Sequence, residues 1–160
     1  MKPLCNVPLG KESAGDDFSH SFMYSVHQMH FLVQKHLEHV LIKNNSLTFS
    51  QFMVLVGFKC RESGPVSQST IATQLDLTEA TVSRHIATLV KLGLIKREED
   101  EKNRRKHVLT LTAKGSVSFT KAKEIINKEL TSLFSTINAK DRDNIMKNFK
   151  VVLGGLISKK

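Results

Sequence analysis

The apolar residues of this chain recur at helical spacing over most of its length, and the longest run lies near its start. Positions 18–43 carry a stripe at steps of four and three residues: Phe22, Val26, Met29, Val33, Leu37 and Val40. At about 100° per residue, these side chains share one side of a helix, in a stripe roughly 80° wide. Asn44, Asn45 and Ser46 then form a polar stop. The pattern predicts a long amphipathic helix over 18–43, preceded by a segment, 1–17, that we interpret as a flexible arm because Pro and Gly interrupt it.

Polar residues in capping positions divide the rest of the chain into five further helices. The expected N-caps, each just before an apolar run, are Thr48 or Ser50, Ser67, Thr78, Thr112 and Asn138. Gly93 ends the helix predicted over 79–92, at a position that favours a positive φ. The second and third helices are expected to bury Phe52, Leu55, Val56, Phe58, Ile71, Ala72 and Leu75. The last two are expected to bury Val117, Ile125, Ile126, Leu130, Leu133, Phe134, Ile145, Phe149, Val152, Leu153 and Leu156.

Residues 66–115 contain the pattern that bears most directly on function. Val66–Ile95 predicts a short helix, a tight turn at Asp76–Leu77 and a second helix. Lys96–Gly115 predicts a strand, a basic loop and a returning strand. A helix-turn-helix followed by a basic hairpin is typical of DNA binding. The second helix fits a major groove, and the hairpin tip can reach the neighbouring minor groove.

The terminal helices predict a homodimer. Their apolar stripes are long, and no other part of the chain is large enough to cover them. Two copies that pack these helices together would remove the stripes from water. A two-fold dimer would also present two recognition helices to a palindromic site.

Composition and charge narrow the class of partner. The 160 residues suit one domain with a substantial core. A formal net charge of +9 favours a polyanionic partner, although charge alone does not separate DNA from RNA or an acidic membrane surface. No run approaches the roughly 18 apolar residues of a membrane span, and the N-terminal segment lacks the apolar core of a signal peptide. Cys5 and Cys60 form no disulfide framework, so we expect a cytoplasmic protein with no membrane partner.

The chain resembles the MarR family of winged helix-turn-helix transcriptional regulators. The resemblance covers about residues 22–158 and is most specific in Thr81–Ile95 and in Asp100–Gly115, where Leu111–Thr112 and Gly115 open the next helix. Family hairpins commonly read Asp-x-Arg-Asp-x-Arg. In this chain those places are held by Asp100, Lys102, Asn103 and Arg105. A lysine therefore replaces the arginine at the tip, and an asparagine replaces the second aspartate.

The resemblance implies a mainly α fold with a small β-wing. A single domain over 18–160 would contain a winged helix-turn-helix at about 47–112, and dimerisation helices at about 18–43 and 112–159. The implied function is that of a homodimeric, ligand-responsive repressor on double-stranded DNA with a palindromic operator. A small aromatic or lipophilic effector would bind between the dimer helices and the DNA-binding part. The candidates for its pocket, with plain core packing as the alternative, are Phe18, Phe22, Met23, Phe52, Met53 and Phe58. No catalytic residue, cofactor or metal ion is expected.

The helix predicted over 79–92 has one apolar and one polar side. Val82, Ile86 and Leu89 fall on the same side and are expected to face the core. The candidates for DNA contacts on the other side are Ala80, Thr81, Ser83, Arg84, Ala87, Thr88 and Lys91. Arg84 is the candidate for a bidentate contact to guanine O6 and N7, and Lys91 for the phosphate backbone. The alternative is an ordinary solvated helix face.

The hairpin supplies a basic cluster of Lys102, Arg104 and Arg105. The resemblance implies that Asp100 pairs with Arg105 and stiffens the hairpin, which leaves Lys102 or Arg104 to enter the minor groove. A lysine fits a narrow groove less well than an arginine. A charged hairpin exposed for solubility is the alternative. Further candidates for phosphate contacts open the helix before the turn: Ser67, Gln68 and Ser69. Plain helix capping is an equally good interpretation of Ser67.

The first helix carries five histidines: His20, His27, His30, His36 and His39. The i, i+3 pairs His27/His30 and His36/His39 have a spacing that can chelate zinc. However, the two pairs lie on roughly opposite sides of the helix, and no carboxylate or cysteine is evidently aimed at either pair. A surface or interface role is therefore favoured over a metal site, and histidines in such a role would allow a response to pH.

Other functions fit the same sequence less well. Cys5 and Cys60, the latter between Lys59 and Arg61, would allow a thiol-based redox-sensing regulator, but a small apolar role for Cys60 is favoured. A winged helix can also serve as a protein-interaction module without DNA, which the excess of basic residues disfavours. No nucleophile elbow, phosphate loop or HExxH run is present, so an enzyme is not expected.

Overall fold

The computed structural model describes residues 16–59, 66–100 and 103–158. Its elements are α1 (Asp16–Asn45), α2 (Phe49–Lys59), α3 (Gln68–Leu75), α4 (Glu79–Lys91), β1 (Ile95–Asp100), β2 (Asn103–Leu111), α5 (Ala113–Leu133) and α6 (Ala139–Ile157). The strands form one two-stranded antiparallel sheet, so the predicted fold class, mainly α with a small β-wing, is confirmed. α1 begins at Asp16, inside the predicted arm, and residues 1–15 of that arm lie outside the described residues.

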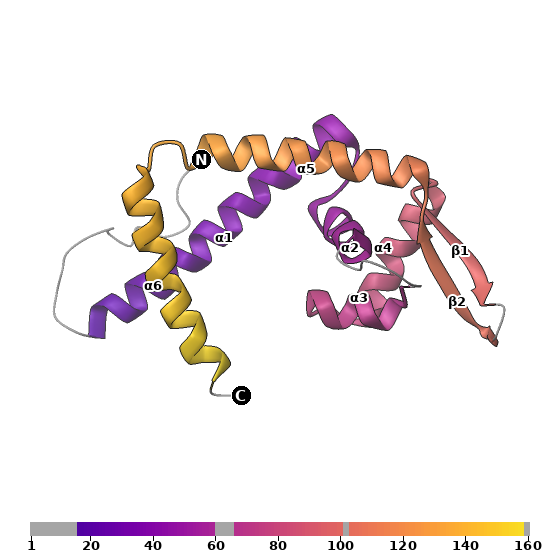
Figure 1. Ribbon diagram of the computed structural model, residues 1–160, viewed down its shortest axis with the longest axis horizontal. Coiled ribbons are helices and arrows are strands. Elements are labelled where there is room, and N and C mark those ends of the chain that lie inside the picture. The colour runs from indigo at the N-terminus through magenta and orange to yellow at the C-terminus, as the bar shows by residue number, and fades with distance from the viewer. Residues whose placement is uncertain (1–15, 60–65, 101–102, 159–160) are drawn as a thin grey trace.

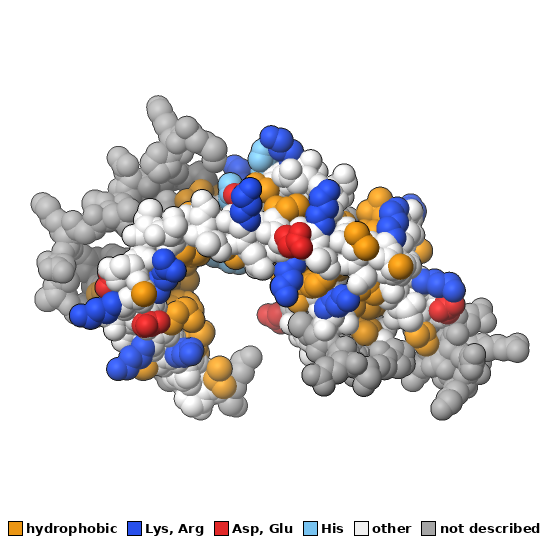
Figure 2. Space-filling model, turned by 45° about the horizontal axis from the view of Figure 1, so that its top comes forward, with side chains coloured by type: hydrophobic (Ala, Val, Ile, Leu, Met, Phe, Trp, Pro, Cys, Tyr) orange, Lys and Arg blue, Asp and Glu red, His pale blue; other side chains and the backbone are white. Residues whose placement is uncertain are grey.

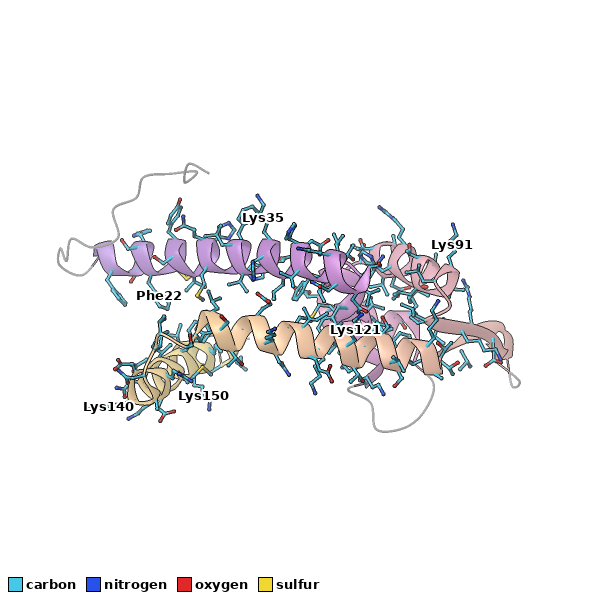
Figure 3. The ribbon with its side chains drawn as sticks, turned by 90° about the horizontal axis from the view of Figure 1, so that it is seen from above. Phe22, Lys35, Lys91, Lys121, Lys140 and Lys150 are labelled. Carbon is cyan, nitrogen blue, oxygen red and sulfur yellow. The ribbon has the colours of Figure 1, made fainter. Side chains whose placement is uncertain are left out.

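The molecule consists of a lobe and a long helical extension (Figure 1). The lobe contains α2, α3, α4 and the β1–β2 hairpin, and α5 runs from the hairpin toward the opposite end of the molecule. α1 packs alongside α5, as the view from above shows (Figure 3). α6 turns back at the far end, and among the described residues it is not closely packed against any other element.

The helix starts follow the predicted caps. Thr48, rather than Ser50, caps α2: its Oγ1 accepts from the Gln51 amide at 3.1 Å, and Gln51 Oε1 accepts from the Thr48 amide at 3.0 Å. This reciprocal pair satisfies two amides that the helix itself leaves free. The side chain of the N-cap likewise accepts from the amide three residues later at Ser67, Thr78, Thr112 and Asn138. The predicted starts of five helices are therefore confirmed.

The core lies in the lobe and takes only part of α1. Leu37 and Leu41 are buried, whereas Met29 of the predicted stripe is 49% exposed. The remaining stripe residues, Phe22, Val26, Val33 and Val40, are only half-buried. α1 meets the lobe with its C-terminal end, and its N-terminal half continues past it (Figures 1 and 3). The sequence therefore predicted the correct helix, but it extended the buried stripe too far and missed Leu41.

α5 packs on the lobe through the side that contains Ile126, as predicted, but Val117 does not lie on that side. Val117 was expected to be buried and is 70% exposed. Ala122 and Ile126 are buried, and Phe119 stacks on Phe52 with ring centroids 5.6 Å apart. The prediction for Val117 is wrong. The buried positions of α5 step by three and four residues along the side that faces α2, and this side includes Gly115. Val117 lies about 200° around the helix from Gly115. Two further expectations are wrong because α5 extends beyond the lobe: Leu133 is 50% and Phe134 38% exposed.

α6 buries none of its residues within the single chain. Four residues that were expected to be buried are 43–62% exposed: Ile145, Val152, Leu153 and Leu156. Figure 2 shows hydrophobic side chains along the inner edge of the part of the molecule that contains α1 and α6. Across residues 16–59, 66–100 and 103–158, no helix has the length and apolarity needed to cross a membrane. The expectation of burial for α6 is therefore not met within one copy of the chain, because none of the described elements covers the helix.

The hairpin is regular at its base and irregular near its tip. Ile95 pairs with Leu111, and the register continues to Glu99 opposite His107 before it shifts. Val66 forms an isolated bridge with Leu109, on the other side of β2 from β1. This bridge ties the hairpin to the start of the helix-turn-helix, an attachment that the sequence did not reveal.

Candidate nucleic-acid interface

α4 is fixed to the lobe by its apolar side. Val82 and Leu89 are fully buried and Ile86 nearly so. Asp76 makes the turn before α4 with a left-handed backbone (φ 51°), and its amide donates to carbonyls of α3. Gly93 ends α4 with a φ of +71°, as predicted. These features give α4 one defined orientation and turn its polar side outward.

The exposed side of α4 contains the residues that the sequence selected. Ala80, Arg84, Thr88 and Lys91 are exposed, as is Ala87, and the flanking residues Thr81 and Ser83 are half-buried. Glu79 is the only acidic residue in this helix and lies in its first turn. The structure therefore brings a guanidinium, an ammonium and small side chains together on one accessible surface.

Two hydroxyls on this surface already have partners. Thr81 Oγ1 lies 2.9 Å from Thr78 Oγ1, within the helix cap. Thr88 Oγ1 donates to the Arg84 carbonyl at 3.1 Å. Since each hydroxyl has one proton, Thr88 offers mainly lone pairs to an outside partner. Arg84 and Lys91 are thus the multiple donors on this side of α4, and Arg84 alone has the planar pair of donors.

Gln68 has an internal partner that the sequence did not predict. Its Nε2 donates to the Glu79 carbonyl at 3.1 Å and links the first turn of α3 to the first turn of α4. Ser67 Oγ accepts from the Thr70 amide at 3.1 Å and lies 2.9 Å from Ser69 Oγ. The capping interpretation of Ser67 therefore holds in the structure. Gln68 fixes the two helices of the motif relative to each other.

The basic cluster of the hairpin is only partly described. Lys102 lies outside the described residues, and for Arg104 and Arg105 the structure gives the backbone of β2 but not the side chains. The expected Asp100–Arg105 pair also lies outside the described side chains. At the base of the hairpin, Lys96 Nζ pairs with Glu98 Oε1 at 2.6 Å on the surface.

Comparison with known proteins identifies this arrangement. Residues 47–107, from the end of the α1–α2 connection to β2, match the model of the MarR family. The chain therefore contains a MarR-family segment over residues 47–107. This family consists of transcription regulators and not of enzymes. The resemblance deduced from the motifs is therefore confirmed.

Similar proteins cover most of the length of the chain. Over 100 residues it is 27% identical to the HTH-type transcriptional regulator BilQ of Clostridium symbiosum, a match that covers 62% of the chain and 67% of BilQ. The transcriptional regulator BldR of Sulfolobus solfataricus has a TM-score of 0.73 at 19% identity and covers 89% of this chain and 99% of its own. MepR of S. aureus, in a complex with DNA, has a TM-score of 0.72 at 19% identity, with 84% and 97% covered. At such identities the two structures establish the fold.

His36 of α1 has a carboxylate partner. His36 Nε2 lies 2.7 Å from Glu129 Oε2, which joins α1 to α5 on the surface. The expectation that no carboxylate is aimed at either histidine pair is therefore wrong, because it considered α1 without its neighbour. Among the described residues, no three His, Cys, Asp or Glu side chains gather as a metal site would require. Cys5 and Cys60 lie outside the described residues.

The residues expected to line an effector pocket do not come together within one chain. Phe52 and Phe58 are buried in the core of the lobe. Phe18 stacks on Phe22 with ring centroids 5.7 Å apart, and Phe18 and Met23 are 70% and 62% exposed. These residues lie toward the start of α1, at the other end of the molecule from α2 (Figures 1 and 3). The expected pocket is therefore wrong for a single copy, because the length of α1 separates Phe18, Phe22 and Met23 from the residues of α2.

Proposed function

We propose that this chain is a sequence-specific DNA-binding regulator that acts as a homodimer on a palindromic operator, most simply as a repressor. The observation that carries the proposal is the exposed side of α4. A helix of 13 residues, anchored by three buried side chains, presents Arg84 and Lys91 to solvent. Such a helix has the dimensions to enter a major groove. The formal net charge of +9 and the DNA complex of MepR, a protein of the same fold, support this choice of partner.

The residues of α4 have distinct roles in this proposal. Ala80 permits a close approach of the helix to base edges because its side chain is small. Arg84 donates two hydrogen bonds to a guanine, and Lys91, near the end of the helix, meets phosphate. Thr81, Ser83 and Thr88 contact phosphate or accept from a base. Ser69 and the amides at the start of α3 hold a phosphate, while Ser67 and Gln68 keep that turn in place.

The wing completes the proposed interface. Lys102 or Arg104 at its tip would enter the minor groove next to the one that α4 occupies, and Asp100 would pair with Arg105. Because the hairpin is bound to the lobe through Val66 and Leu109, its base has a fixed position relative to α4. This attachment favours simultaneous contacts by α4 and the wing.

Exposed apolar residues on α6 support the homodimer. A soluble monomer seldom exposes an apolar surface of this extent, and a second copy is the partner that a palindromic site requires. We also propose that a small aromatic or lipophilic effector binds the homodimer. Since one chain does not assemble its pocket, the partner would have to supply a wall. Release of bound duplex by members of a panel of such compounds is the test of this element.

A selection experiment tests the proposal as a whole. The full chain is incubated with a library of random 30-base-pair duplexes, and the bound duplexes are sequenced over several rounds. We expect an inverted repeat to emerge, and the affinity for it to fall steeply with salt as phosphate contacts are lost. No enrichment of any sequence, together with salt-independent binding, would favour a protein-interaction module instead.

The first test within this interface is Arg84→Ala. Loss of the bidentate donor should cost about 1–3 kcal/mol on the selected duplex and relax the base preference at one position of each half-site. Arg84→Lys is the matched variant: it keeps the charge but loses the planar pair of donors, so it should restore the salt dependence and not the base preference. Fluorescence anisotropy with a set of single-base variants of the duplex measures the affinity and the base preference. Full affinity and preference in Arg84→Ala would mean that another residue reads the base.

The wing should behave differently from α4. Lys102→Ala or Arg104→Ala should weaken binding to all duplexes alike and lower the slope of log affinity against log salt by about one per lost phosphate contact. Lys96→Ala serves as the control because its ammonium is already paired with Glu98 at the base of the hairpin. Titrations at several salt concentrations give the slopes. A loss confined to one base pair, with the slope unchanged, would argue against a backbone or groove-width role.

A further inference from the structure

The first turn of α5 closes around the end of α4. After α4 ends at Lys91, the next three carbonyls point to residues about twenty positions later in the chain. Lys114 Nζ donates to the Leu92 carbonyl at 2.8 Å. Thr112 Oγ1 donates to the Gly93 carbonyl at 2.8 Å, and the Thr112 amide donates to the Leu94 carbonyl at 3.1 Å. Leu92 is the C-cap residue of α4, and Gly93 and Leu94 follow it, so the start of α5 binds the carbonyls of the segment that ends α4.

Gly115 makes this contact unusually close. A Cβ placed on Gly115 would lie 2.0 Å from the Leu94 carbonyl oxygen and 2.9 Å from its carbon. The Gly115 amide also donates to Thr112 Oγ1 at 2.9 Å, so the same hydroxyl serves both helices. Backbone therefore touches backbone, and even a methyl group would force the two segments apart.

This contact joins the first turn of α5 to the segment that directly follows α4. α4 packs against α2, α3 and β1, and within the described residues α5 is not among its closely packed neighbours. Elsewhere α5 is bound to the lobe through α2, where Phe52 stacks on Phe119 and Lys59 donates to Ser116 at 2.9 Å. The end of α4 is thus held from two sides, by the buried side chains of α4 and by the first turn of α5.

We propose that Thr112, Lys114 and Gly115 form a joint that sets the angle between α5 and α4, and that they are positioning residues for the recognition helix. The part of this inference that concerns DNA rests on the proposed function. None of the three side chains needs to touch DNA. They act through the carbonyls of Leu92, Gly93 and Leu94, and so determine how the exposed side of α4 is presented.

The test compares two glycines. Gly115→Ala adds a methyl group at the joint, whereas Gly154→Ala adds one where no atom lies within 4 Å, on the side of α6 opposite Ile145. Residual dipolar couplings of the α4 and α5 amides, measured on the full chain, report the angle between the helices. We expect a changed angle in Gly115→Ala and none in Gly154→Ala. Affinity for the selected duplex should fall about tenfold, the size of one lost base contact, while affinity for an unrelated duplex changes much less.

A second pair of variants keeps the inference testable if Gly115→Ala does not fold. Thr112→Val removes the hydroxyl that joins Gly93 to Gly115, and Thr112→Ser retains it. The angle should change in the first variant and return in the second. An unchanged angle in Thr112→Val and in any folded Gly115→Ala would overturn the joint. A changed angle with full affinity for the selected duplex would overturn its positioning role. If the unmodified chain selects no duplex, the proposed function fails, and the couplings still decide whether the joint exists.

Discussion

Replacing Val152 with aspartate is expected to separate the chain into monomers and to abolish tight binding to an inverted-repeat duplex. Val152 is 48% exposed in one copy and lies on the apolar side of α6, near Ile145 and Leu156. If a second copy covers this side, the new carboxylate is buried without a partner, which costs several kcal/mol. A monomer engages one half-site only, so affinity should fall although α4 is unchanged. Analytical ultracentrifugation and anisotropy on the selected duplex measure the two effects.

Asn144→Asp is the matched control for this variant. It places an equivalent carboxylate in the same helix, about 100° around it from Ile145, on the polar side. It should leave both the sedimentation and the affinity unchanged. The unmodified chain could also sediment as a monomer at micromolar concentration and still bind the inverted repeat tightly. In that case the homodimer and the two-half-site mechanism would both be wrong. Dissociation by both variants alike would point to net charge rather than to a buried contact.

Leu41→Ala should lower the free energy of unfolding by about 2–5 kcal/mol, the usual range for a leucine truncated in a core. Leu41 is fully buried at the end of α1, where that helix meets the lobe. Truncation leaves a cavity between α1 and the lobe, because the surrounding side chains relax only in part. Urea unfolding followed by circular dichroism, at one fixed protein concentration, measures the loss.

The neighbouring residue supplies the comparison. Ile42→Ala removes the same number of carbon atoms from a side chain that is 52% exposed. Its cost should be about 1 kcal/mol or less, as for most surface substitutions. Equal losses in the two variants would mean that Ile42 is also buried, which in an assembled protein would identify it as part of the contact between copies. A negligible loss in Leu41→Ala would show that α1 is not held to the lobe by this side chain.

The sequence predicted the features that depend on near neighbours. A cap is decided by residues three positions apart, and the predicted caps at Ser67, Thr78, Thr112 and Asn138 each accept a hydrogen bond from the expected amide. The buried side of α4 was also predicted correctly, because Val82, Ile86 and Leu89 are the only apolar positions there that form a continuous stripe.

Features that depend on distant segments were not predictable in this way. Val117 and Phe119 are equally apolar, and only the position of α2 determines that Phe119 packs inward. Gln68 has the side chain of a phosphate-binding residue, yet its partner is a carbonyl eleven positions away. His36 was assessed without α5, which supplies Glu129. In each case periodicity along one helix is insufficient, because the partner belongs to another element.

The length of α5 has a mechanical consequence. Its 21 residues make a rod of about 32 Å at a rise of 1.5 Å per residue. α4 is attached at one end of this rod and α6 at the other (Figure 1). A tilt of about 10° at the α6 end would displace the other end by roughly 5–6 Å over that length, which exceeds the spacing of about 3.4 Å between successive base pairs. A tilt of this size at the α6 end would therefore be enough to move a recognition helix out of step with its half-site.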